Sequence, residues 1–127
     1  MKDYSAYITA HIKRNLCERE ALESHRARVI EQLNRIAPSW AQKYGVMRVL
    51  LFGSFAKGTH RLNSDVDVAV EGLRGEDYWK AWAEIETLSG LEIDLRCLED
   101  FPPPSRALIL KNGVVIYEKG TRSDTDW

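Results

Sequence analysis

Cysteine is scarce in this chain, which holds two cysteines in 127 residues and no CxxC pattern. A reduced environment is the simpler interpretation, with Cys17 and Cys97 predicted to act as small apolar fillers. The sequence also lacks an apolar run long enough to span a membrane, and its first residues lack the basic-then-apolar order of a signal peptide. We therefore expect a cytoplasmic protein with no membrane contact.

An excess of positive charge is also missing. The formal net charge is -1 and the sequence pI is about 6.3, which argues against broad nucleic-acid binding, because such binding depends on many cations. A nucleotide is compatible with this balance, since metal and local amides can meet its few phosphates. Hydrophobic residues make up 44% of the chain and charged residues 29%, which predicts one soluble globular domain. The three histidines have no metal-binding spacing, and His60 and Arg61 are expected in a solvated loop.

Two familiar phosphate-binding motifs are absent. The chain contains no GxGxxG pattern, which argues against a dinucleotide-binding fold. Gly53 and Gly58 have GxxxxG spacing, but Thr59 and His60 follow where a Walker loop needs lysine and then serine or threonine. The sequence therefore argues against a P-loop ATPase as well.

Hydrophobic periodicity predicts a mixed α/β fold in three consecutive segments. Residues 1–44 form a helical segment packed on the core, residues 45–118 form the core itself, and residues 119–127 are a loose tail. The N-terminal helix is expected to break at Pro38, because proline lacks an N–H and its ring clashes with the preceding turn. The other predicted elements are strands at Arg48–Phe52, Asp65–Val70, Glu92–Leu98 and Val114–Tyr117, and helices starting at Ser54, over Glu76–Ser89 and over Ser105–Lys111.

Aromatic residues are predicted to serve the core. Tyr78, Trp79 and Trp82 are assigned to the core and rim of one helix, because its acidic surroundings do not suit a base-stacking platform. Trp40 is also assigned to the core.

The Gly53–Ser54 pair lies between a predicted buried strand and a predicted helix start. Free N–H groups at such a junction attract anions, and Gly53 lets the backbone approach a phosphate without a clashing Cβ. The alternative is an ordinary turn in which Ser54 caps the helix. The pair alone does not decide between these interpretations.

Asp65 and Asp67 alternate on a valine-rich strand, so their carboxylates should leave the same face. Like charges this close disfavour joint ionisation unless a cation lies between them, and Mg²⁺ takes carboxylate and phosphate oxygens together. The alternative is the solvated outer face of an edge strand. Asp94, on a strand expected to neighbour the first, could complete a three-carboxylate cluster that ligates metal and accepts a proton, or could belong to an ordinary polar face with Glu92 and Arg96.

Together, Gly53-Ser54, ten intervening residues, Asp65-Val-Asp67 and the later Asp94 resemble the polymerase-beta-like nucleotidyltransferase superfamily. The run from Val49 to Gly58 is similar to its minimal nucleotidyltransferase branch. The resemblance implies a mixed sheet of about four strands flanked by helices, two Mg²⁺ ions on the aspartates, and ATP phosphates at the glycine-serine turn. Lys57, where many relatives carry arginine, and Ser64 are expected to contact the nucleotide. Many such members are antitoxins paired with a helical HEPN-type toxin, which some silence by adenylylating a tyrosine.

The resulting hypothesis is a Mg²⁺-dependent nucleotidyltransferase. Asp65, Asp67 and Asp94 are the predicted catalytic and metal-binding residues, and Gly53 and Ser54 the predicted phosphate cradle. The expected acceptor is a hydroxyl group, presented by a toxin partner because one small domain has little surface for a second substrate. Two alternatives stay open: a binding module that neutralises its toxin sterically, and a transferase for a small hydroxylated metabolite. A homo- or hetero-oligomer is possible in each case.

Overall fold

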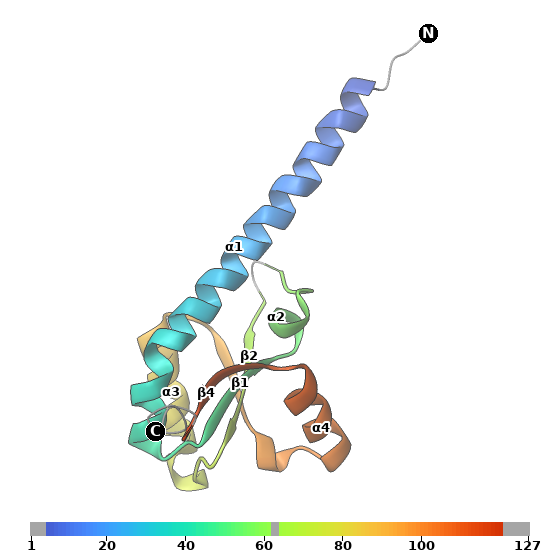
Figure 1. Cartoon of the computed structure of the whole chain (residues 1–127). Coiled ribbons are helices and arrows are strands. Elements are labelled where there is room, and N and C mark those ends of the chain that lie inside the picture. Colours follow the sequence, from blue (N-terminus) through green and yellow to red (C-terminus); the bar gives the residue numbers. More distant parts are fainter. Residues whose placement is uncertain (1–4, 62–63, 121–127) are drawn as a thin grey trace, which may run out of the picture.

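The computed structural model describes residues 5–61 and 64–120 of the chain, and the predicted tail at 119–127 lies mostly outside these ranges. Four strands form one mixed sheet in the order β3-β2-β1-β4 (Figure 1). β1 pairs antiparallel with both β2 and β4, and β2 pairs parallel with β3. The predicted mixed α/β fold with about four strands and a long N-terminal helix is confirmed. The strands are β1 (Arg48–Phe52), β2 (Val66–Glu71), β3 (Ile93–Cys97) and β4 (Val114–Glu118).

Helices cover both faces of this sheet. Their bounds are α1 (Ser5–Tyr44), α2 (Ser54–Lys57), α3 (Tyr78–Ser89) and α4 (Pro103–Asn112), with short 3-10 turns at Gly75–Asp77 and Leu98–Asp100. Side chains alternate between the two faces of each strand, so Val66, Val68 and Val70 pack with α1 and α3 in the larger core. Leu50 and Ala69 point to the opposite face and pack with Leu98 and Ile109 in a smaller core under α4.

Helix α1 runs without a break through Pro38, so the predicted break is wrong. The lost N–H and ring clash of a helical proline cost about 3 kcal/mol. Burial of large apolar side chains contributes roughly 1.5–3 kcal/mol each, and Leu33, Ile36 and Trp40 are all buried on either side of the proline. Packing of this stretch against the sheet therefore outweighs the local cost.

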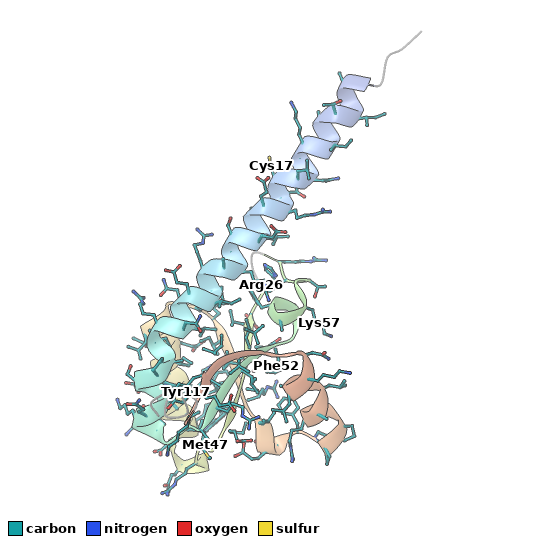
Figure 2. All side chains as sticks on the ribbon, viewed as in Figure 1. Cys17, Arg26, Met47, Phe52, Lys57 and Tyr117 are labelled. Carbon is teal, nitrogen blue, oxygen red and sulfur yellow. The ribbon has the colours of Figure 1, made fainter. Side chains whose placement is uncertain are left out.

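The N-terminal half of α1 extends away from the rest of the molecule (Figure 1). Ile8, Ile12 and Leu16 repeat every four residues and are each about half exposed, at 54%, 53% and 49%. Cys17 lies on this extended half and is also exposed (Figure 2), so its predicted role as a core filler is wrong. Both Cys17 and Cys97 are free thiols. Within the described ranges, no helix has the length and apolar content to cross a membrane.

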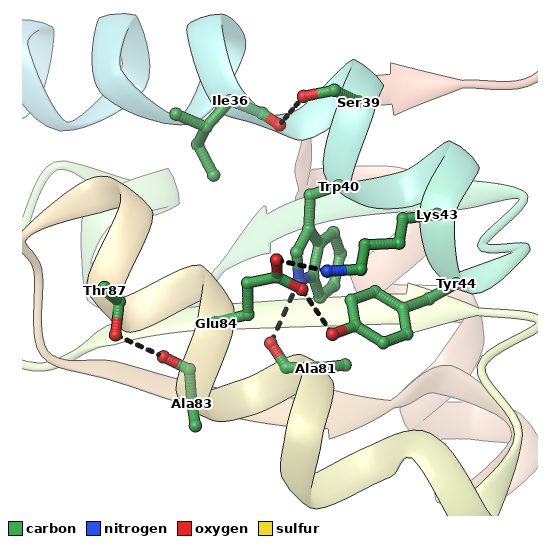
Figure 3. Close-up of polar contacts among 9 residues, drawn as sticks. All are labelled: Ile36, Ser39, Trp40, Lys43, Tyr44, Ala81, Ala83, Glu84 and Thr87. Carbon is green, nitrogen blue, oxygen red and sulfur yellow. Dashed lines mark hydrogen bonds and ion pairs between the residues drawn. The ribbon is translucent and has the colours of Figure 1, made fainter.

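A group of polar contacts joins α1 to α3 (Figure 3). The buried Trp40 indole N–H donates to the carbonyl oxygen of Ala81 at 3.0 Å, so its predicted place in the core is confirmed. Lys43 forms an ion pair with Glu84 at 2.7 Å, and the Tyr44 hydroxyl donates to the same carboxylate. Burial, together with this hydrogen bond to Glu84, raises the pKa of Tyr44 to about 12. These contacts fix the direction of α1 relative to the sheet.

Strand β3 lies at one edge of the sheet, and side chains of α3 meet its backbone there. The Trp82 indole N–H donates to the carbonyl of Ile93 at 2.7 Å, and the Tyr78 hydroxyl donates to the carbonyl of Leu95. Trp79 stacks on Trp82 with ring centres 5.5 Å apart but is 73% exposed, so its predicted place in the core or rim is wrong.

Candidate active site

The turn between β1 and α2 begins at Gly53, whose φ of 71° lies in the left-handed region that favours glycine. Gly53 is the N-cap of α2, and no side chain caps this helix. The alternative in which Ser54 caps the helix is therefore not what the structure has. Because α2 has only four residues, its dipole is small, and the attraction of this turn for an anion depends mainly on the first N–H groups, which lack partners within a helix.

The carboxylate of Asp67 lies directly against this turn. A Cβ atom added to Gly53 would come within 2.2 Å of the Asp67 Oδ2 atom and 3.3 Å of its Cβ. Real side chains do not approach this closely, so a glycine is required for both its backbone angle and its missing side chain. The Gly53 turn and the Asp67 carboxylate of β2 thus form one site.

Asp67 and Asp94 are partners in the parallel register of β2 and β3, as the sequence suggested for two neighbouring strands. Both point to the sheet face that α4 covers only in part, because Asp67 alternates with the buried Val66 and Val68. Asp65 is exposed and immediately precedes β2. Burial raises the pKa of Asp67, and the negative charges of Asp94 and Asp65 raise it further. The three predicted carboxylates therefore influence one another electrostatically.

Asp94 already has a cationic partner. The Arg96 guanidinium, two residues along β3, donates to its two carboxylate oxygens at 3.0 and 3.4 Å. Among residues 5–61 and 64–120, no group of three or more His, Cys, Asp or Glu side chains is arranged to hold a metal ion. The three predicted metal ligands, Asp65, Asp67 and Asp94, thus supply the hard oxygen donors that Mg²⁺ prefers. For Asp94 to bind the metal ion, its ion pair with Arg96, whose side chain is 59% exposed, would have to break.

The remaining predicted nucleotide contacts lie around the same turn. Ser54 is the first residue of α2 and is half-buried, and Lys57 is exposed in the last turn of that helix. The Ser64 hydroxyl accepts a hydrogen bond from the Arg61 N–H at 2.8 Å, so it stabilises the loop before Asp65. Ser54 and Lys57 make no hydrogen bond through their side chains within the described part of the chain, which leaves both for a ligand.

A mostly apolar cavity of about 290 Å³ lies between α2 and α4. Gly53 and Lys57 line it, but none of the three aspartates does. The other lining residues are Phe52, Ala56, Leu108, Ile109, Asn112 and Gly113. The cavity is thus next to the turn at Gly53 and Ser54 rather than between the carboxylates.

A second hollow, between α1 and α2, was not expected from the sequence. This α1–α2 groove of about 580 Å³ is lined by Arg19, Leu22, Glu23, Arg26, Ala56, Lys57, Gly58 and His60. His60 is only 4% exposed and stacks on Phe55 at 4.4 Å, so the prediction that it lies in a solvated loop is wrong. Its Nε2 donates to the Leu22 carbonyl at 2.7 Å, which ties the loop after α2 to α1. No local sequence signal could have revealed a contact between residues this far apart.

Comparison with known proteins places this arrangement in a family. The family described as "Polymerase beta, Nucleotidyltransferase" matches residues 34–122. A protein of Methanocaldococcus jannaschii named "Putative protein adenylyltransferase" is 32% identical over 75 residues, which span 57% of this chain and 81% of that protein. A solved "putative minimal nucleotidyltransferase" is 27% identical with a TM-score of 0.54, over 76% of this chain and 94% of its own.

A third similarity is to a complex. A chain in the structure of a tri-AMPylated Shewanella oneidensis HEPN toxin with its MNT antitoxin is 16% identical, with a TM-score of 0.53, over 75% of this chain and 76% of that one. At this identity the likeness shows a shared fold.

Proposed function

We propose that this chain, which belongs to the polymerase beta nucleotidyltransferase family, transfers adenylate from ATP to a hydroxyl group of a partner protein. The observation that carries the proposal is the contact between Gly53 and Asp67, which joins a phosphate-binding turn to a carboxylate pair in one site. The name of the Methanocaldococcus jannaschii relative supports adenylate as the transferred group.

The phosphates of ATP are assigned to the turn and to α2. The N–H groups after Gly53 and the Ser54 hydroxyl would bind the β- and γ-phosphates, and Lys57 would offset their charge from the last turn of the helix. Ser64 would act indirectly, by holding the loop that leads to Asp65.

The acceptor hydroxyl is assigned to the β3 side of the site. Its oxygen would attack the α-phosphorus and form the new P–O bond while the bond to the β-phosphate breaks and pyrophosphate leaves. The hydroxyl proton would pass to the Asp94 carboxylate, once Arg96 has moved aside.

Asp65, Asp67 and Asp94 would hold magnesium. Bound there, Mg²⁺ would stabilise the negative charge that develops on the phosphates. Burial raises the pKa of Asp67 most, and the neighbouring negative charges of Asp94 and Asp65 raise it further; those charges support this assignment, because they call for a cation between them.

The acceptor is proposed to be a tyrosine of a HEPN-type toxin, which would make this chain an antitoxin of the cytoplasm. The similar fold in the tri-AMPylated HEPN toxin complex supports this choice. A separate protein acceptor also suits the cavity beside the Gly53 turn, which holds only about 290 Å³.

The test is label transfer from α-labelled ATP to a HEPN-type toxin with Mg²⁺ present, followed by intact mass of the toxin. Asp67→Asn should abolish transfer, whereas Glu92→Gln, a matched loss of one carboxylate just before β3, should leave it intact. Undiminished transfer by the Asp67→Asn protein would refute the assignment.

One observation favours a second candidate, a binding module that neutralises its partner sterically. The ion pair between Arg96 and Asp94 leaves the carboxylates without a metal-ready arrangement. If this candidate holds, the wild-type protein binds and silences the toxin without adding any adenylyl group, and Asp67→Asn does so equally well.

A further inference from the structure

The α1–α2 groove concentrates positive charge in a chain whose formal net charge is -1. Three cationic side chains, Arg19, Arg26 and Lys57, line it against one carboxylate, that of Glu23. The groove therefore carries a local excess of two positive charges, unlike the chain as a whole. Its volume of about 580 Å³ is twice that of the cavity between α2 and α4.

One of the three cations, Arg26 of α1, is held in place by a contact with α2. The Arg26 Nε–H donates to the Phe55 carbonyl at 2.6 Å, which fixes the guanidinium at the junction with α2 (Figure 2). The buried His60 holds the following loop to α1 through Leu22. Arg26 therefore binds an anion with little loss of side-chain entropy, whereas Arg19 and Lys57 are exposed at the rim of the groove.

Lys57 connects the groove to the candidate active site. It lines both the groove and the cavity that borders Gly53, so α2 is a shared wall between them. An anion that leaves the phosphate-binding turn past Lys57 would meet Arg26 and then Arg19, which lie seven residues apart on one side of α1.

We propose that the α1–α2 groove is a second anion-binding site, which takes an oligophosphate and, resting on the proposed function, receives the pyrophosphate that adenylate transfer releases. The three cations offset most of the negative charge of pyrophosphate, and the opposing charge of Glu23 keeps its binding reversible. The groove thus provides a release path that starts at the phosphate turn and ends on the extended part of α1.

The test measures binding of inorganic pyrophosphate by calorimetry in EDTA at low ionic strength. Without metal, the carboxylates of Asp65, Asp67 and Asp94 repel pyrophosphate from the active site, so the groove is the site observed. The wild-type chain should bind one pyrophosphate. Arg19→Glu should weaken binding roughly tenfold or more, because it replaces an attraction with a repulsion near a multiply charged ligand.

Two variants make the result specific. Arg14→Glu makes the same charge change on an exposed α1 residue that lies about 140° around the helix from Arg19, so it should leave the affinity nearly unchanged. Glu23→Gln should tighten binding roughly threefold or more, which no loss of structure could produce. Equal weakening by Arg14→Glu and Arg19→Glu, no tightening by Glu23→Gln, or no binding by the wild type would each overturn the proposal.

A kinetic arm separates this proposal from the proposed function. In the transfer assay, Arg19→Glu should raise the inhibition constant of added pyrophosphate without changing KM for ATP. If no transfer occurs at all while the calorimetric pattern holds, the proposed function fails and the oligophosphate site stands. If transfer occurs but the calorimetric pattern is absent, the reverse is true.

Discussion

Replacement of Gly53 by alanine should reduce the transfer activity far more than it reduces the stability of the fold. The new Cβ would lie 2.2 Å from Asp67 Oδ2 and 3.1 Å from its carboxyl carbon, so the carboxylate must move. The backbone angles of Gly53, φ 71° and ψ -144°, lie in a region used almost only by glycine, which adds a strain of about 1–3 kcal/mol for a residue with a side chain. In a domain of this size each kcal/mol of strain corresponds to a melting temperature lower by about 4 °C.

Gly58 supplies the matched control. It ends the same helix with a φ of 76°, but a Cβ added there would meet nothing within 4 Å. Gly58 has the αL conformation (ψ 15°), so Gly58→Ala should lose about 1–2 kcal/mol of stability, no more than Gly53→Ala, measured by urea or thermal unfolding, without displacing any site residue. Label transfer from ATP should fall roughly 100-fold or more in Gly53→Ala, because a displacement of about 1 Å in a reacting group can cost that much. Transfer by Gly53→Ala at the level of Gly58→Ala would refute the link between the turn and Asp67.

Three further outcomes follow from the contacts described. Asp67→Asn should raise the melting temperature at neutral pH without Mg²⁺, because the raised pKa of Asp67 means that the fold resists its ionisation. This gain should disappear as pH falls through that pKa and the wild-type carboxyl becomes protonated, and added Mg²⁺ should stabilise the wild type alone. Glu84→Gln should lower the pKa of Tyr44 from about 12 toward its ordinary value, which ultraviolet titration against Tyr44→Phe would show. In the wild type the stability linked to Tyr44 is present below pH 10 and is lost as pH rises through about 12. Trp40→Phe should cost about 2–3 kcal/mol in urea unfolding, since it removes buried volume and leaves the Ala81 carbonyl without its donor; a cost under 0.5 kcal/mol would contradict this account.

Sequence patterns were sufficient to predict the strands and the turn that follows β1. Alternating valines in β2 and apolar alternation in β3 place Asp67 and Asp94 on one face, and their pairing across β2 and β3 needs only that these strands be neighbours. The local pattern carries this information because strand side chains repeat every two residues.

Contacts between segments that are far apart in the sequence could not be predicted from such patterns. Continuation of α1 through Pro38 depends on packing of Ile36 and Trp40 against the sheet, which propensity does not include. Burial of His60 depends on Phe55 and on a carbonyl 38 residues earlier in the chain. The ion pair of Arg96 with Asp94 is local, but either residue could equally have faced water, so only the structure decides the state of that carboxylate.

Occupied carbonyls on β3 restrict how this protein can associate. An exposed strand edge normally has unpaired N–H and C=O groups, with which a strand of another chain can pair. Here the Trp82 indole and the Tyr78 hydroxyl already take the outward carbonyls of Ile93 and Leu95. An incoming peptide would have to displace both aromatic donors before it could add to the sheet beside Asp94. Recognition of a partner by strand addition at this margin is thereby disfavoured, and the proposed acceptor would reach the carboxylates through its side chains.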